Sequence, residues 1–459
     1  MANIVYRKVK QPNLDCTNIP VQLSDETMKE RIQKVLSKME EEKYDTLVIY
    51  ADLEHGNNFE YLTGFLPRFE EALLVINKDS KNYMIMGNEN LNKVSKSRIE
   101  SLAVHAPYFS LPNQPMDNKI SFKEILQSAE LKEGKKTGIV GWKNFTSQFE
   151  DNNKLYDVPY YVVDTIMNIV GKDNMDNATR LFIGEKGVRC TNNPNEIEHY
   201  EFGASLAGDS MIKAMNKLDL GVKETELGAC LNALGQKNSV VTIAASGPRF
   251  VKANIYPTDN VVKLGDTISL TVGYKGGLSS RSGYAVKDEN DLDPEIRDYL
   301  DKVVKPYYGA TVTWLENIHC GMKGKELYRL MEEVLPKDKY HWGLCPGHLC
   351  SDEEWLSSPI YAESEEVLES GMILQLDIIP SVAGYGGTSV ESSLVIADEK
   401  LQGRLKEETP LLYQRMMERR KYIIEELHIN LHSDVLPLTS SLGYLRPFFL
   451  EKEKAMACE

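Results

Sequence analysis

The sequence predicts an α/β N-terminal domain followed by an α+β C-terminal domain. In the first half, short apolar runs alternate with helical segments, which is typical of an α/β domain. In the second half, helices and strands gather in separate stretches, which favours helices packed beside an antiparallel sheet. With 459 residues, of which 42% are hydrophobic and 26% charged, the chain can bury a full core in each domain.

The N-terminal domain is placed at residues 1–178, and we expect its first residues, up to Leu23, to be irregular. Ser24 can cap an amphipathic helix that extends to about Glu42. A second helical pattern covers Ser121–Leu131. Short apolar runs bounded by turn residues predict strands at Thr46–Tyr50, Ala72–Asn77, Tyr83–Met86, Gly138–Gly141 and Tyr160–Val163.

The C-terminal domain is placed at residues 179–459 and ends in a helical extension. A helix begins at Asn193 and Pro194, because Asn caps free amides and Pro suits the first helical position. Further helices are predicted at Thr225–Leu234, Pro294–Trp314, Gly324–Leu335 and Glu408–Glu426. Strands are predicted at Val240–Ala244, Thr267–Val272, Met372–Ile378 and Val390–Ile396.

The composition excludes several kinds of partner. The formal net charge is -15, from 68 acidic and 53 basic residues, whereas nucleic acids and anionic membranes attract clustered Lys and Arg. The N-terminus, MANIVYRKVKQPNLD, lacks the apolar run of a signal peptide, and no stretch approaches the ~20 apolar residues of a membrane helix. The seven cysteines are scattered without CxxC spacing. We therefore expect a cytoplasmic protein that acts on a small molecule or a peptide.

Several short segments, in a fixed order, resemble one superfamily. The segment Asn58–Phe65, NFEYLTGF, resembles the N-domain signature of creatinase and the Xaa-Pro peptidases, aminopeptidase P and prolidase. The second half is similar to their pita-bread catalytic domain at Asn195–Glu198, Ser246–Pro248, Gly265–Asp266, Pro346–His348, Gly371–Met372 and Glu391. The resemblance implies a pita-bread fold for the α+β domain, a hydrolase ancestry and a homodimer.

The resemblance also implies a metal site, of which two positions have changed. In the metal-dependent members, two Asp, one His and two Glu hold two divalent ions, and a bridging water attacks an amide. Thr271 occupies the first Asp position, in the segment SLTVG. The second Asp position falls on Ser282 by ungapped counting, or on Arg281 if one residue is deleted before Gly277. Neither alternative is a carboxylate.

The other three ligand positions keep groups that can bind a metal. His348 in PGHLC matches the His, Asp377 matches the fourth ligand with a shorter side chain, and Glu391 matches the fifth. Two carboxylates do not balance two divalent charges, so we expect no dinuclear centre and no other cofactor. A single divalent ion held by His348, Asp377 and Glu391 stays open as an alternative.

Without two metals, the predicted chemistry depends on His348. In creatinase, the metal-free relative, a His activates water, carboxylates hold a guanidinium-like substrate, and a neutral Asn stands at the position of Thr271. The creatinase His corresponds here to Asn254 or Ile255, and neither side chain can act as a general base. His348 is therefore the candidate base, and Asp377 or Glu391 would orient it or bind a cationic group.

Two arginines are candidates for contacts with a substrate. Arg281, together with Thr271, would contact the substrate if its side chain points inward, and there it would disfavour even one metal ion. Alternatively, Arg281 pairs with one of the site's carboxylates in a buried structural ion pair. Arg68 follows the LTGF motif and would reach a substrate carboxylate across a dimer, as N-domain residues do in creatinase.

The residues near His348 in the sequence are predicted to have structural roles. His341, Trp342 and Trp355 are predicted to be packing or rim residues. Asp352–Glu354, where the peptidases often place a second substrate-contacting His, is predicted to form a solvated turn. Cys345 and Cys350 flank His348, but this spacing is not typical of a zinc site.

Two classes of function therefore stay open. The first is a hydrolase of a C–N bond in a small amino-acid-like, guanidino or dipeptide substrate, working without the usual dinuclear centre. A variant of this class is a single-metal Xaa-Pro dipeptidase or aminopeptidase. The second class is a non-catalytic binding protein that has kept the fold and a ligand site.

Overall fold

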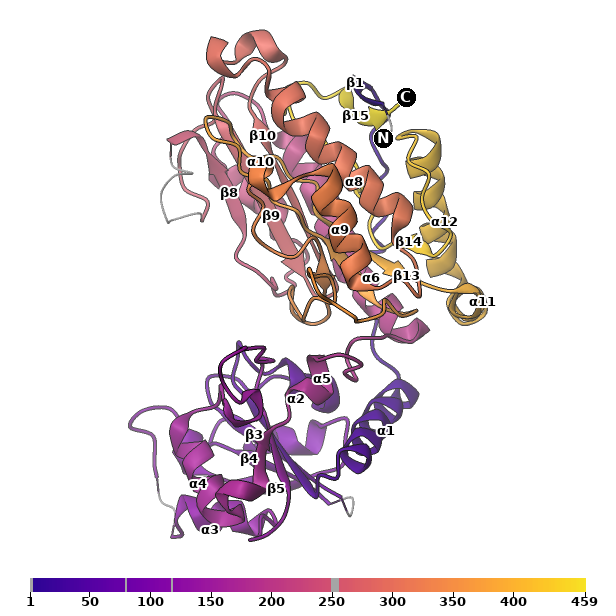
Figure 1. Cartoon of the computed structure of the whole chain (residues 1–459). Coiled ribbons are helices and arrows are strands. Elements are labelled where there is room, and N and C mark those ends of the chain that lie inside the picture. The colour runs from indigo at the N-terminus through magenta and orange to yellow at the C-terminus, as the bar shows by residue number, and fades with distance from the viewer. Residues whose placement is uncertain (1–2, 79–80, 117–118, 249–255) are drawn as a thin grey trace. The chain divides into compact units, whose positions relative to one another are not determined.

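The computed structural model describes residues 3–78, 81–116, 119–248 and 256–459. The chain forms two compact units, one of residues Leu23–Cys190 and one that combines Met1–Gln22 with Thr191–Glu459. The N-terminal unit is α/β, and the other unit is α+β with antiparallel sheets, as the sequence predicts. Both chain termini lie in the second unit, where they are close together (Figure 1).

These units differ at both ends from the predicted domains, 1–178 and 179–459. The division falls after Cys190, and the first 22 residues belong to the C-terminal unit. The reason is a strand pair: β1 (Ile4–Lys8) runs antiparallel to β15 (Lys454–Cys458). The prediction of irregular structure before Ser24 missed β1, because the partner that satisfies its backbone lies at the other end of the chain.

A mixed six-stranded sheet forms the centre of the N-terminal unit. The strand order is β5-β4-β3-β2-β6-β7, with β2 antiparallel to β3 and parallel to β6. The strands are β2 (Thr46–Ala51), β3 (Ala72–Asn77), β4 (Asn82–Met86), β5 (Leu102–His105), β6 (Thr137–Val140) and β7 (Met175–Asn177). Every residue of β2 and β3 is buried, which explains why continuous apolar runs predicted both strands.

The described residues of this unit form five α-helices. They are α1 (Asp25–Glu41), α2 (Asn57–Thr63), α3 (Phe122–Ser128), α4 (Tyr160–Val170) and α5 (Arg180–Ile183). The predicted cap of α1 is confirmed, since Ser24 accepts a hydrogen bond from the amide of Thr27 at 3.1 Å. The predicted strand Tyr160–Val163 is wrong, because it is the first turn of α4. The apolar residues of α4 recur at helical spacing and pack into the core. This burial outweighs the preference of the segment YYVV for a strand.

The C-terminal unit contains two larger antiparallel sheets. The first has the order β10-β9-β8, with β8 (Ile243–Ser246), β9 (Thr267–Tyr274) and β10 (Gly277–Tyr284). The second has the order β11-β12-β13-β14, with β11 (His348–Leu349), β12 (Ile373–Leu376), β13 (Ser392–Ile396) and β14 (Val435–Pro437). The amide of Ser280 donates to the carbonyl of Glu391 at 3.3 Å, so the sheets meet where β10 approaches the start of β13.

Helices pack on and around these sheets. They are α6 (Pro194–Lys217), α7 (Glu224–Leu231), α8 (Lys305–Asn317), α9 (Gly324–Val334), α10 (Lys337–Tyr340), α11 (Glu399–Glu408) and α12 (Pro410–Glu425). The predicted start of α6 is confirmed by a capping box between Asn193 and Glu196. α6 packs against β9 and β10, where Gly203 is required because a Cβ would collide with the carbonyl of Lys275.

One predicted helix of this half differs from the structure. Pro294–Trp314 is not one helix, since two short turns, Pro294–Ile296 and the π-helical Leu300–Val304, precede α8. The sequence also missed α11, whose charged residues show little apolar periodicity. In the described parts of the chain, no helix is long and apolar enough to cross a membrane.

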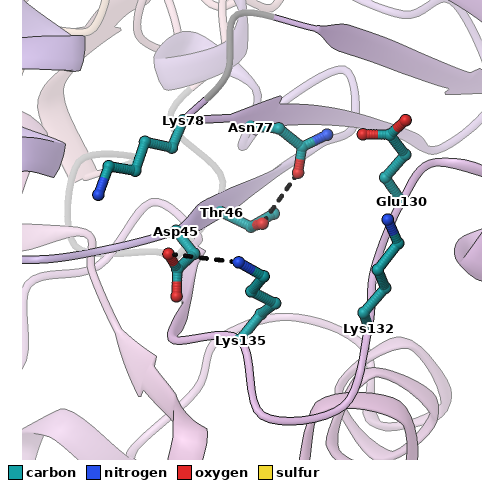
Figure 2. A pocket seen from close by; sticks show the side chains of 7 residues that line it. All are labelled: Asp45, Thr46, Asn77, Lys78, Glu130, Lys132 and Lys135. Atoms are coloured by element: carbon teal, nitrogen blue, oxygen red, sulfur yellow. Dashed lines mark hydrogen bonds and ion pairs between the residues drawn. The ribbon is translucent and has the colours of Figure 1, made fainter.

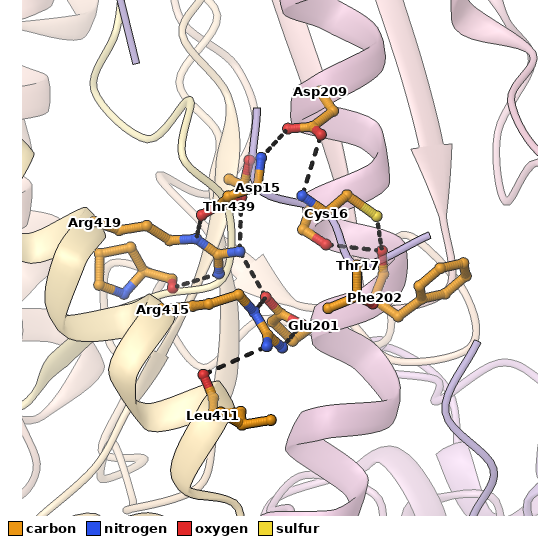
Figure 3. Close-up of polar contacts among 12 residues, drawn as sticks. Asp15, Cys16, Thr17, Glu201, Phe202, Asp209, Leu411, Arg415, Arg419 and Thr439 are labelled. Carbon is orange, nitrogen blue, oxygen red and sulfur yellow. Dashed lines mark hydrogen bonds and ion pairs between the residues drawn. The ribbon is translucent and has the colours of Figure 1, made fainter. Parts of the chain in front are cut away.

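A buried charge network holds the N-terminal segment against α6 and α12 (Figure 3). Arg419 on α12 donates to Asp15 at 2.6 and 2.9 Å and to Glu201 on α6 at 2.6 Å. Asp209, two turns further along α6, accepts hydrogen bonds from the amides of Asp15 and Cys16 at 3.2 and 3.1 Å. These contacts explain why residues before Gln22 belong to the C-terminal unit.

Asp209 predicts a specific dependence of stability on pH. Burial raises the pKa of Asp209 to about 6, whereas an Asp in an unfolded chain titrates near ~3.9. The folded protein therefore binds an additional proton between these values, and its stability falls as the pH rises from about 4 to about 6. Asn can accept only one of the two amide hydrogen bonds of Asp209, so the variant loses some stability at both pH values. Because Asn does not titrate, we expect the free energy of unfolding of Asp209→Asn, relative to the wild type, to rise by roughly 2 kcal/mol between pH 4 and pH 7.

Urea denaturation of both proteins at the two pH values measures this difference. The control is Asp219→Asn at an exposed position, which should change the free energy of unfolding by less than about 0.5 kcal/mol. A difference in the free energy of unfolding between Asp209→Asn and the wild type that is the same at pH 4 and at pH 7 would contradict this role of Asp209.

Candidate functional site

The hairpin of β9 and β10 carries the first two predicted ligand positions. Thr271 lies directly opposite Ser280, and the Thr271 hydroxyl donates to the Ser280 hydroxyl at 3.0 Å. Paired residues of antiparallel strands point to the same face, so Ser280 and Ser282 share the face of Thr271, and Arg281 points to the other face. This face of the hairpin therefore presents hydroxyl groups, and neither strand contains an Asp or a Glu.

Arg281 is fully buried on the far side of the hairpin. Its guanidinium donates to five neutral acceptors, at 2.6 to 3.2 Å: the carbonyls of Ser280, Glu391, Ser441 and Tyr444, and the hydroxyl of Ser392. Burial lowers the pKa of Arg281 to about 10, which still leaves it cationic at neutral pH. Neither a place beside the substrate nor an ion pair with the site's carboxylates is seen. Arg281 instead joins β10, β13 and the C-terminal segment.

His348, the first residue of β11, is at the centre of the site and fully buried. Its ring stacks on Trp355 with the centroids 4.1 Å apart, and Nδ1 lies 3.1 Å from the carbonyl oxygen of Leu349. Nε2 lies 3.2 Å from Glu354 and 3.8 Å from Asp377. The distance between Nε2 and Glu354 is that of an ion pair, but the angles of this contact do not meet those of a hydrogen bond. Within the described residues, Nε2 has no hydrogen-bond partner.

Asp377 and Glu391 lie at the ends of two neighbouring strands. Asp377 directly follows β12, and Glu391 directly precedes β13, so the antiparallel pairing of these strands brings both carboxylates to the same edge. One oxygen of Glu391 accepts a hydrogen bond from Ser389 at 2.9 Å. Oδ1 of Asp377 is buried and has no hydrogen-bond partner in the described part of the chain. A buried acceptor left open in this way is available to a ligand.

The charges of the site perturb one another. Burial raises the pKa of Asp377, and the nearby His348 offsets this only in part. Burial and the charge of Asp377 raise the pKa of Glu391 well above its usual value. Burial lowers the pKa of His348, but the contact with Glu354 and the charge of Asp377 outweigh it, so the net shift is upward. Two carboxylates, Glu354 and Asp377, thus lie beside one imidazole, and Glu391 adds a third acidic group close to Asp377.

Glu354 is the site residue that the sequence interpretation missed. The prediction of a solvated turn at Asp352–Glu354 is wrong, because Asp352 is buried and anchors the loop. Asp352 accepts a hydrogen bond from the hydroxyl of Tyr200 at 3.1 Å and pairs with Lys275 at 3.1 Å. The available signal was positional, since related peptidases often place a second functional side chain in this segment. Trp355 is partly exposed, as predicted for a rim residue, but its stacking on His348 was not foreseen.

The side chains of the site do not fit a pair of divalent ions. Thr271 and the serines opposite it supply neutral oxygens, and β9 and β10 contain no Asp or Glu. In the part of the chain that the structure describes, no group of three His, Cys, Asp or Glu side chains is arranged to hold a metal ion. A pair of divalent ions would therefore lack the ligands that it needs.

Arg68 belongs to the N-terminal unit, is exposed, and places its guanidinium 4.5 Å above the ring of Phe69. Asn254 and Ile255, which correspond to the creatinase His, lie outside the described residues.

Comparisons with known proteins agree with this two-unit architecture. Residues 31–139 match the family model of the creatinase/prolidase N-terminal domain, and residues 198–398 match that of metallopeptidase family M24. A sequence search of curated proteins found no match. The two family matches follow each other in the order that pita-bread hydrolases show. The chain belongs to the superfamily of creatinase and the Xaa-Pro peptidases, which confirms the resemblance seen in the sequence.

Solved structures show the same fold at low sequence identity. An Xaa-Pro dipeptidase from Bacillus anthracis is 17% identical, with a TM-score of 0.60 over 81% of this chain and 96% of that chain. A prolidase from Thermococcus sibiricus is 16% identical, with a TM-score of 0.63 over 82% and 96% of the two chains. An X-Pro aminopeptidase from Thermotoga maritima is 16% identical, with a TM-score of 0.60 over 80% and 95%. At these identities the likeness establishes the fold alone.

Proposed function

We propose that this protein hydrolyses a C–N bond in a small cationic, amino-acid-like or guanidino compound, without a dinuclear metal centre. His348 acts as the general base. The observation that carries this proposal is the position of its Nε2, 3.2 Å from Glu354 and 3.8 Å from Asp377 and without a hydrogen-bond partner among the described residues. A base must be a titratable group with a free position toward the proton that it accepts.

The charge of the site supports a cationic substrate. Glu354 and Asp377 lie beside the imidazole of His348, and Glu391 lies close to Asp377, while Arg281 is committed to neutral acceptors on the other face of the hairpin. Burial and mutual repulsion disfavour the ionised forms of Asp377 and Glu391, and a bound cation would relieve this cost. An ammonium or guanidinium group also supplies donors for the open Oδ1 of Asp377.

The proton transfers follow from the two nitrogens of His348. Nδ1–H faces the carbonyl of Leu349, which fixes the tautomer and leaves Nε2 as the basic atom. Nε2 takes a proton from water as the water attacks, and the carboxylates of Glu354 and Asp377 stabilise the imidazolium that forms. The same proton then passes to the leaving nitrogen. Because His348 has no exposed surface, water reaches Nε2 only when the Trp355 side of the site moves.

A second function, ligand binding without catalysis, is favoured by that same burial. A permanently stacked imidazole would serve as a wall of a binding site rather than as a base. The two functions share the cationic ligand and differ only in turnover.

A substrate screen in the presence and absence of a chelator tests the proposal. Dipeptides ending in Pro, creatine-like compounds and ectoine-like compounds are incubated with the full chain, and products are followed by NMR. We expect turnover of a cationic or guanidino compound that survives the chelator. Binding of such a compound by calorimetry without any product would favour the second function. Turnover of Xaa-Pro dipeptides that the chelator abolishes would contradict both.

A further inference from the structure

Trp355 covers the candidate base from the solvent side. Its indole stacks on the imidazole of His348 with the ring centroids 4.1 Å apart and an angle of 22° between the ring planes. Trp355 is 38% exposed, whereas His348 has no exposed surface. Of the two carboxylates beside Nε2, the side chain of Glu354 is 22% exposed and that of Asp377 only 7%. A ligand would therefore approach His348 past Glu354 and Trp355.

The indole of Trp355 is held less firmly than the buried indoles of the same unit. Trp314 and Trp342 are buried, and their indole N–H groups donate to the carbonyls of Pro346 and Leu335. Within the described residues, the indole N–H of Trp355 has no hydrogen-bond partner. The ring–ring attraction in such a stack favours the closed position by only about two- to tenfold. An open position of this indole is therefore accessible at room temperature.

The backbone beside Trp355 is fixed, so the opening motion is a rotation of the side chain. The amide of Leu356 donates to the carbonyl of Leu349 at 2.9 Å, and the amide of Leu349 donates to the carbonyl of Ser357 at 2.7 Å. On the other side of Trp355, Asp352 is buried. These contacts hold the loop in place while the exposed indole is free to turn.

A cavity of about 220 Å³ in the N-terminal unit shows the opposite arrangement (Figure 2). It has no aromatic side chain in its lining, and several of its polar groups already bind one another. The hydroxyl of Thr46 donates to Asn77 at 2.9 Å, and Lys135 lies 3.8 Å from Asp45. At the candidate site, by contrast, a polar atom without a hydrogen-bond partner lies beneath an aromatic cover.

We propose that Trp355 is the gate of this site and determines which ligands reach His348. The indole turns away from the imidazole to admit a ligand, and compounds too large to pass the turned indole are excluded. The face of the indole also attracts a cationic group, which favours cationic compounds over neutral ones of the same size. The selection of substrates rests on the proposed function of His348, whereas the covering of its imidazole does not.

Hydrogen–deuterium exchange at Cε1 of each histidine, followed by mass spectrometry of the full chain, measures how often each imidazole meets solvent. We expect Trp355→Ala to speed the exchange of His348 by about two- to tenfold. Trp355→Phe keeps a ring over the imidazole and should stay close to the wild type. The matched control is Trp142→Ala, because Trp142 stacks on His55 in the N-terminal unit with the centroids 4.9 Å apart. This control should leave the exchange of His348 unchanged.

Selectivity is then measured with the smallest compound found by the substrate screen and a derivative of it that carries an added benzyl group. In Trp355→Ala, the kcat/KM of the larger compound relative to the smaller one should rise by about tenfold or more. If the chain binds the compounds without turnover, the ratio of their affinities takes the place of the ratio of kcat/KM. The gate is thus tested even if the proposed hydrolysis fails.

Two results would overturn the proposal. One is equal exchange of His348 in the wild type and in a Trp355→Ala variant whose thermal unfolding midpoint shows that it is folded. The other is faster exchange of His348 with unchanged selectivity, which would mean that the indole covers the imidazole without controlling access to it.

Discussion

Arg281→Ala should lower the free energy of unfolding by roughly 3–5 kcal/mol. The substitution removes five buried hydrogen bonds and the volume of the guanidinium. The carbonyl of Tyr444 loses its donor, whereas the carbonyls of Ser280, Glu391 and Ser441 each keep another donor. These carbonyls belong to β10, to the start of β13 and to the C-terminal segment, so the junction of the two sheets would loosen. Urea denaturation at neutral pH measures the loss.

Ser282→Ala is the matched control for this variant. Ser282 is the next residue of β10, points to the opposite face, and should change the free energy of unfolding by less than about 1 kcal/mol. If Arg281→Ala unfolded like the wild type but lost affinity for ligand, Arg281 would be a ligand contact and not the residue that joins the two sheets.

His348→Ala should reduce kcat on the substrate found by the screen by about 10²–10⁴-fold, the usual contribution of a positioned base. Glu354→Gln should have a smaller effect on kcat and should move the pH profile. The base works as neutral imidazole, so activity rises as the pH passes upward through the raised pKa of His348. Removing the charge of Glu354 lowers this pKa, and the acidic limb should shift to lower pH.

The rates and pH profiles of the two variants show whether His348 and Glu354 act in catalysis or only in packing. Unchanged turnover in His348→Ala would remove His348 as the base. An acidic limb that stays in place in Glu354→Gln would mean that Glu354 does not set the pKa of His348.

Local sequence signals predicted most of the fold. Apolar runs predicted β2 and β3 because both strands are buried on both faces, and the caps Ser24 and Asn193 predicted the starts of α1 and α6. The pairing of β1 with β15 was not predictable, because it joins the two ends of the chain. The helix α4 was misassigned because β-branched residues at its start pack into the core.

Most residues of the candidate site could be predicted individually from the sequence, but their positions relative to one another could not. The sequence identified His348, Asp377 and Glu391 as retained positions, but it left open which residue of β10 faces Thr271. Strand register decides this, since a shift of one residue exchanges the two faces of a strand, and the short turn between β9 and β10 places Ser280 opposite Thr271.

Glu354 could not be assigned for a related reason. Its loop is anchored through Asp352 by Tyr200 on α6 and by Lys275 between β9 and β10. Both anchors are distant in the sequence, so no local pattern distinguishes this loop from a solvated turn. The contact between Glu354 and His348 depends on that anchoring.

The metal content of the purified chain tests the central claim most directly. The protein is produced with manganese, cobalt and zinc present, freed of loosely bound ions by gel filtration, and measured by elemental mass spectrometry. The absence of Asp and Glu from β9 and β10 predicts no pair of tightly bound divalent ions. Two such ions per chain, retained through gel filtration, would contradict a hydrolase that works without a dinuclear centre.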